Sequence, residues 1–186
     1  RSEAEASGIL DFFLYSLLDS RFQRKYLGGS MMRDLRDTFI RRLLEWYRRP
    51  YEKALKHSRR FHPITPIEAL AKRTAQYLSL GHRAGEGWFL TADMIDLLGH
   101  GCRGIVCLQP FACLPNHITG EGMAHKLHIA YPEAVFLSLD CDASVSQVNQ
   151  INRLKLMMNA LTEKTPITET QSILRKTISA KKGSAL

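Results

Sequence analysis

The sequence predicts an α/β protein: a Rossmann-like three-layer domain with a short parallel sheet, preceded by a helical region. Three observations favour this fold class. The first third carries only helical periodicity, two short apolar runs later in the chain resemble buried strands, and helical segments alternate with those runs. The 186 residues are 45% hydrophobic, which is enough to bury one core of this kind.

Helices are expected over residues 9–27 and 31–57, with two glycines between them. Apolar residues recur at three- and four-residue steps along the second segment, with Arg and Asp between them: Leu35, Phe39, Leu43, Trp46 and Tyr47. Pro50 lacks a backbone N–H, so we expect the second helix to end or kink near Arg49.

A third helix follows the extended connector 61–66, and from residue 85 the pattern changes. The expected order is helix 88–98, strand 105–108, helix 123–131, strand 134–139 and helix 146–161. This alternation predicts a parallel βαβ unit, and such sheets bind ligands beyond the carboxyl ends of their strands. The loops 109–119 and 140–147 fall at that edge.

The expected organisation is a helical region over 1–62, the α/β domain over 63–162 and a polar tail over 163–186. No run of about 18 apolar residues occurs, so no membrane partner is expected. Four cysteines, two in or beside an apolar run, do not suggest a disulfide framework, and a reducing, cytoplasmic location is expected. The chain opens at Arg1 rather than Met, which suggests a piece of a longer protein.

The chain is basic, with a formal charge of +8 and a pI of about 9.5. The excess lies in the first half, at Arg21, Arg24, Lys25, Arg41, Arg42, Arg48, Arg49, Lys53, Lys56, Arg59 and Arg60. This positive charge is expected to belong to solvated helix faces, or to a surface that binds an acidic partner or the phosphates of CoA. Nucleic acid is an unlikely partner, because no nucleic-acid motif accompanies the charge.

Cys113 is the main candidate for chemistry, because it lies between Pro110 and Pro115 directly after a predicted strand. Thiolates bind iron–sulfur clusters, and a proline-stiffened loop lowers the entropic cost of holding the thiol. Cys107 is expected in the core, about 20 Å away along an extended strand. Cys102 is expected in a turn. Cys141 follows the second strand at the same edge and is an additional candidate ligand.

Polar residues around this edge are expected to line the site. They are Gln109, Asn116, His117, Asn149, Gln150, Asn152 and Arg153. Asn116 is expected to cap the turn into the helix start at 120–122. His117, four residues after Cys113, leaves open a thiol enzyme with a Cys–His nucleophile. A basic interaction module without catalysis is the third reading.

Three stretches carry a family resemblance: GEGWFLTA at 85–92, QPFACLPNHITGEGM at 109–123 and VNQINRLKLM at 148–157. Over residues 63–160 the chain resembles the C-terminal part of the CoA-substrate-specific activase proteins related to 2-hydroxyacyl-CoA dehydratases, the 2-hydroxyglutaryl-CoA dehydratase activator-like family. Two positions depart from the family pattern. Gly is expected where Ala112 stands, and a Tyr and a Pro-Gly are expected in the loop 140–144.

The resemblance implies Rossmann-like subdomains that bind a [4Fe–4S] cluster through cysteines scattered along a long chain. Cys113 would be one cluster ligand, and the other ligands would lie upstream of Arg1. ATP would bind an upstream activase domain that drives low-potential electron transfer. The implied partners are these upstream domains and an acyl-CoA dehydratase or reductase component. The chain by itself is expected to catalyse nothing.

Overall fold

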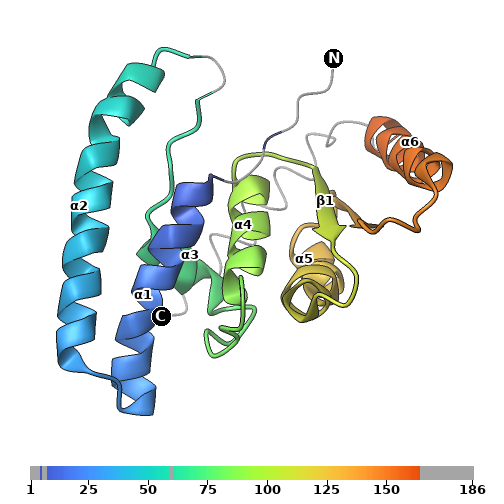
Figure 1. Cartoon of the computed structure of the whole chain (residues 1–186). Helices are drawn as coiled ribbons and strands as arrows, with labels where there is room; N and C mark the ends of the chain where they lie inside the picture. The colour runs from blue at the N-terminus through green and yellow to red at the C-terminus, as the bar shows by residue number, and fades with distance from the viewer. Residues whose placement is uncertain (1–4, 6–7, 59–60, 164–186) are drawn as a thin grey trace, which may run out of the picture.

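The computed structural model describes residues 5, 8–58 and 61–163, and its elements follow the predicted order (Figure 1). They are α1 (Ile9–Leu27), α2 (Met31–Leu55), α3 (Ile67–Thr74), α4 (Trp88–Gly99), β1 (Gly104–Gln109), the π-helical turn η1 (Asn116–Gly120), the 3-10 turn η2 (Glu121–Met123), α5 (Ala124–Ala130), β2 (Val135–Asp140) and α6 (Gln147–Glu163). None of the described helices is both long and apolar enough to pass through a bilayer.

The two strands form the predicted parallel pair. Gly104 lies opposite Val135, and Gln109 lies opposite Asp140. Within the described residues the sheet has these two strands, so the fold is a mixed helix and strand arrangement. The Rossmann-like three-layer domain stays a prediction, and so does the division of the chain at residue 63. The predicted polar tail lies, after Glu163, outside the described residues.

Helix α4 lies at the centre of the hydrophobic core. One cluster joins it to α1 and α3 through Leu14, Tyr15, Ile67, Leu70, Ala71, Trp88, Phe89 and Ala92. A second cluster joins it to the sheet and α5 through Met94, Ile95, Leu98, Ile105, Met123, Leu127 and Ala134. Because α4 contributes to both clusters, it fixes the sheet relative to the helices before it.

Helix α6 approaches β1 from the side opposite to α4 (Figure 1). The approach is close at Gly104, where an added Cβ would lie 2.7 Å from Cε of Met157 and 2.9 Å from a methyl group of Leu161. A side chain at Gly104 would therefore require the ends of the Met157 and Leu161 side chains to move.

Helix α2 continues through Pro50 to Leu55, so of the expected end or kink near Arg49, the end is wrong. The proline is exposed, and water can satisfy the carbonyl that loses its helical partner. Interactions on the other side of the helix span the proline. The guanidinium of Arg48 lies 2.9 Å from Glu52 and 2.7 Å from Asp11 of α1. These ion pairs hold the turns before and after Pro50 against α1.

Candidate functional site

The carboxyl ends of β1 and β2 lie at one edge of the sheet, together with the start of α6. The backbone N–H of Cys141 donates to the carbonyl of Gln109 at 2.7 Å and joins the two loops that leave the strands. The side-chain amide of Gln150 donates to the carbonyl of Asp140 at 2.7 Å. The predicted meeting of both loops and the first turn of α6 at this edge is confirmed.

Cys113 lies on a tight turn just past β1 and is partly exposed. Its backbone N–H donates to the carbonyl of Pro110 at 3.1 Å. Ala112 has a φ of 57°, and it is the one described residue other than glycine with a positive φ. This left-handed conformation costs an L-residue about 1–2 kcal/mol. Glycine adopts this conformation without that cost.

Asn116 fastens the loop to the end of the strand. It is buried, and its side-chain amide donates to the carbonyl of Leu108 at 3.2 Å. The expectation that Asn116 caps the turn at 120–122 is wrong, because the amide is used across the loop instead. The hydrogen bond fixes where the loop leaves β1 and thereby where Cys113 lies.

The stretch 85–92 packs directly behind this loop. An added Cβ on Gly85 would lie 3.0 Å from Cγ of Pro115, and one on Gly87 would collide with the backbone of the preceding turn. The hydroxyl of Thr91 donates to the carbonyl of Thr119 at 2.6 Å, in the buried interior. A hollow of about 220 Å³ remains between the two stretches. Two motifs separated in the sequence thus form one packed unit.

Gln109 and His117 both face Glu121. Gln109 is only 2% exposed, and its amide donates to Oε2 of Glu121 at 2.9 Å. Nδ1 of His117 lies 3.6 Å from the same oxygen. The hydrogen bond between residues 113 and 117 joins backbone atoms, from the N–H of His117 to the carbonyl of Cys113 at 3.2 Å. This geometry directs the imidazole toward Glu121 and gives the Cys–His nucleophile no support.

Cys107 is half-buried in β1 and packs against the second core cluster, as expected for a core residue. The separation of about 20 Å from Cys113 assumed an extended chain, whereas the chain turns between Pro110 and Cys113, so this distance is too long. Burial raises the pKa of the Cys107 thiol, and the nearby Glu121 and Cys113 raise this pKa further. Cys102 lies in the turn between α4 and β1, as expected.

The remaining residues of the predicted site lie toward solvent. Cys141 is exposed, and its thiol donates to the carbonyl of Leu139 at 3.6 Å. Nη1 of Arg153 lies 4.0 Å from Oδ2 of Asp140. Asn149 and Asn152 are both exposed on α6. These side chains are available to a ligand or partner, whereas Gln109, Asn116 and Gln150 hold the edge together.

An apolar rim around Cys113 was not anticipated from the sequence. It consists of the exposed side chains of Leu108, Phe111, Leu114 and Ile118. The available signal was the concentration of large apolar residues in a loop, which soluble proteins otherwise keep polar. A loop of this kind is typical of a surface that another protein surface covers.

The described residues contain no group of three or more His, Cys, Asp or Glu side chains that could hold a metal ion. A [4Fe–4S] cluster takes four thiolate ligands. At this edge the described chain offers Cys113, and Cys141 on the neighbouring loop. These two thiols fit such a cluster only if other parts of a longer protein supply the remaining ligands.

Comparisons with known proteins leave the family open. No protein-family model, no curated protein and no solved structure matches the chain. The activase-like interpretation therefore depends on the three motif stretches, and the structure adds where those stretches lie.

Proposed function

We propose that the chain is the C-terminal part of a longer, dehydratase-related activase protein and supplies Cys113 to a [4Fe–4S] cluster shared with upstream domains. The observation that carries the proposal is the position of Cys113: partly exposed, on a braced turn at the carboxyl edge of a parallel strand pair. When bound, the cluster would carry low-potential electrons, which ATP hydrolysis in an upstream domain drives toward an acyl-CoA dehydratase or reductase component. The Rossmann-like three-layer fold and a cytoplasmic location belong to the same proposal.

The residues around Cys113 would hold the thiol in place before the cluster forms. Asn116 fixes the loop to β1, and Thr91 fixes it to α4. A ligand held in this way loses little conformational entropy on binding. Cys141 would be the additional ligand from this chain, because its backbone is hydrogen-bonded to the residue that ends β1.

The apolar rim would exclude water once an upstream domain covers the edge. Solvent exposure and hydrogen bonds to sulfur are among the features that set the potential of an iron–sulfur cluster. Phe111, 83% exposed in this chain, is the rim residue with most surface left to bury. The four cysteines are free thiols, which supports a reducing compartment.

Anaerobic reconstitution of the full-length protein with iron and sulfide tests the proposal. We expect broad absorption at the blue end of the visible range, and a lower iron content in Cys113→Ser. Cys102→Ser is the matched control, because Cys102 lies in the turn before β1 rather than at the edge. The isolated 186-residue chain should stay colourless. An iron content that Cys113→Ser leaves at the level of Cys102→Ser would exclude Cys113 as a ligand.

A further inference from the structure

Helix α2 has its charged side toward the protein. Its three buried residues are Asp34, Asp37 and Arg41. Nε of Arg24 on α1 lies 2.6 Å from Asp34, and Arg41 forms an ion pair with Glu68 of α3. The helix is therefore held to its neighbours by ion pairs, together with a half-buried Leu44 that packs against the first core cluster. This is the reverse of the usual surface helix, whose apolar stripe faces the core.

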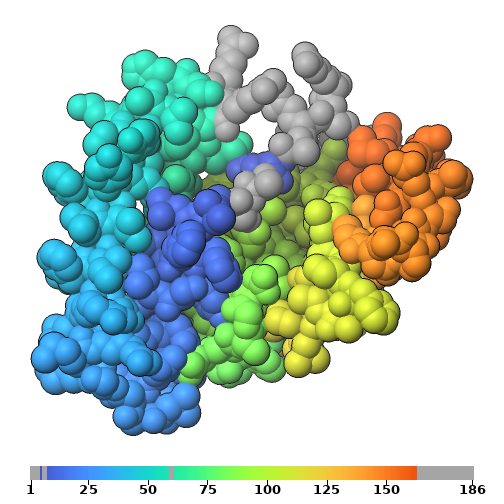
Figure 2. Space-filling view, viewed as in Figure 1, coloured from blue at the N-terminus to red at the C-terminus, as the bar shows by residue number. Residues whose placement is uncertain are grey.

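The apolar side of α2 faces solvent along its whole length. The exposed side chains include Leu35, Phe39, Leu43, Trp46, Tyr47 and Tyr51. A helix of 25 residues is about 37 Å long at 1.5 Å per residue. The helix forms one outer side of the molecule (Figures 1 and 2). A contiguous apolar surface of this length marks an interaction site rather than scattered surface residues.

Charges on α2 are divided between its two sides. Each of its four carboxylates forms an ion pair with an arginine: Asp34, Asp37, Glu45 and Glu52. In contrast, Arg42, Arg49 and Lys53 are exposed and form no ion pair with any described residue. The apolar stripe is thus flanked by cations whose charge no described carboxylate neutralises.

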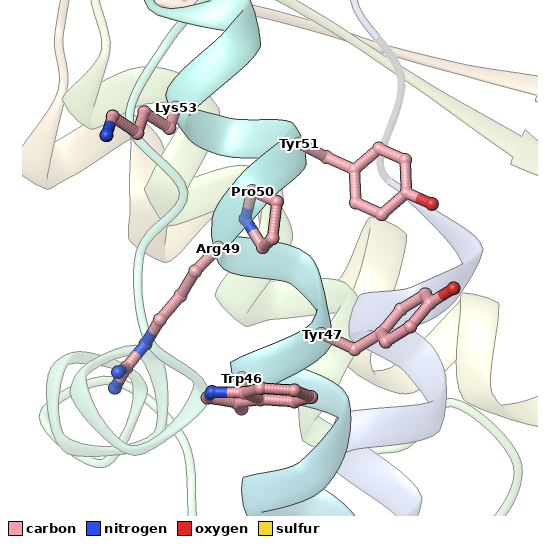
Figure 3. A pocket seen from close by; sticks show the side chains of 6 residues that line it. All are labelled: Trp46, Tyr47, Arg49, Pro50, Tyr51 and Lys53. Carbon is pink, nitrogen blue, oxygen red and sulfur yellow. The ribbon is translucent and has the colours of Figure 1, made fainter.

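A hollow of about 620 Å³ opens on this side of α2. Figure 3 shows Trp46 and Pro50 in the middle, Tyr47 and Tyr51 extending to one side, and Arg49 and Lys53 extending to the other. Trp, Tyr and Arg are the residues that dominate binding energy in protein–protein interfaces. All six residues that line the hollow belong to α2, so a partner side chain placed there would contact this helix.

We propose that the outer face of α2 binds an acidic amphipathic helix of a protein partner, with an apolar stripe flanked by Asp and Glu. The apolar stripe matches recognition by helix packing, and the uncompensated cations select carboxylates. A second copy of this chain would bring Arg42, Arg49 and Lys53 against the same cations. A bilayer has no side chain to fill the hollow beside Trp46, and nucleic acid would leave the aliphatic residues uncovered.

The proposal is independent of the cysteine site and is testable with designed peptides. Two helical peptides about seven turns long share one leucine stripe, flanked by Glu in one and by Lys in the other. We expect the Glu peptide to bind at least about tenfold more tightly, with an affinity that falls as salt rises. Phe39→Ser should weaken it at least about tenfold, as expected for an interface anchor.

The variant Phe13→Ser is the matched control, because Phe13 is an exposed phenylalanine on α1. Circular dichroism checks that both variants keep the helical content of the native chain. Arg49→Glu combined with Lys53→Glu should reverse the preference between the two peptides. Equal binding of the two peptides, no binding of either, stronger binding to phosphatidylserine vesicles or duplex DNA, or a Phe39-dependent dimer without peptide would each overturn the proposal.

Discussion

Helices α4 and α2 show two different ways of holding a helix in this molecule. The 12 residues of α4 include seven buried ones, among them Trp88, Phe89 and Ile95. The 25 residues of α2 include three buried ones, and all three are charged. Helix α4 is held by apolar packing on both sides, whereas α2 is held on one side by ion pairs and by the half-buried Leu44. The difference shows that regular apolar spacing identifies a helix without telling which of its sides is covered.

The two modes of attachment differ in strength. Burial of a large apolar side chain contributes about 1.5–3 kcal/mol. Ion pairs with one partner near the surface contribute about 0–1 kcal/mol each. Arg24 and Glu68, the partners of buried charges in α2, are both partly exposed. We therefore expect α4 to contribute more than α2 to the free energy of unfolding. The main role of α2 would then be the surface that it exposes.

The largest expected effect comes from making one substitution in both helices. Phe89 is 6% exposed and stacks on Tyr15 with ring centroids 5.5 Å apart, whereas Phe39 is 68% exposed. Phe89→Ala should lower the free energy of unfolding by about 3–5 kcal/mol. Phe39→Ala should change it by less than about 0.5 kcal/mol. Denaturant titration of both variants measures this, and similar losses would contradict the assignment of the two faces.

The second effect uses the pH dependence of stability. Burial, with a further contribution from Asp19, raises the pKa of Tyr15 from 10.0 to about 12. Folded Tyr15 therefore keeps its proton while the unfolded chain releases it. The contribution of Tyr15 protonation to the free energy of unfolding is fully present below pH 10. It is lost as pH rises from 10 to 12, which lowers the free energy of unfolding by about 2–3 kcal/mol.

Tyr15→Phe should remove this part of the pH dependence. Its stability at neutral pH should fall by about 1 kcal/mol, because the Tyr15 hydroxyl donates to the carbonyls of Arg83 and Gly85 at 3.2 and 3.3 Å. Unfolding curves of both proteins at several pH values between 9 and 12 provide the comparison. Stability–pH profiles that run parallel would show that Tyr15 ionises normally in the folded protein.

The third effect separates the two sides of α2. Arg41 is buried between Glu45 and Glu68, whereas its neighbour Arg42 is exposed. Because both carboxylates can still reach water, Arg41→Met should cost about 1–2 kcal/mol, below the cost of breaking a fully buried pair. Arg42→Met should stay within about 0.5 kcal/mol. Equal values in thermal unfolding would mean that the inner ion pairs do not hold the helix.

The smallest effect concerns the loop that α4 supports. Ala112→Gly relieves a left-handed conformation, and the gain is partly offset by the greater freedom of glycine in the unfolded chain. The expected net stabilisation is about 0.5–1 kcal/mol. Ala143→Gly, at an exposed loop position with ordinary backbone geometry, should stabilise nothing. A loss of stability in Ala112→Gly would contradict the strain assigned to Ala112.

Local sequence patterns predicted the elements of the fold well. Helical spacing located α1, α2 and α4, and two apolar runs located β1 and β2. Helix α2 does not end at Pro50, although a proline favours an end locally, because Arg48 pairs with Glu52 beyond the proline and with Asp11 of α1. The sequence showed the apolar stripe of α2 but not that this stripe is exposed to solvent. The charged side faces the protein because it forms ion pairs with residues of α1 and α3.

The sequence predicted where the candidate site lies, but not the contacts between its residues. The rule for parallel strands brought the two loops and the start of α6 to one edge. It does not specify the turn at Ala112, so the extended-chain distance between Cys107 and Cys113 was wrong. Nor does it assign hydrogen bonds, and Asn116 turned out to reach back to Leu108. Both features depend on how the loop folds back onto the end of β1 over a few residues, which strand order and residue spacing do not specify.

The central claim, that Cys113 binds the cluster, is tested most directly by electron paramagnetic resonance of the reduced, reconstituted full-length protein. Replacing a thiolate ligand alters the electronic structure of the cluster, while a distant substitution does not. We predict that Cys113→Ser changes the g values or removes the signal, and that Cys102→Ser leaves the native spectrum. A native spectrum in Cys113→Ser would contradict the account.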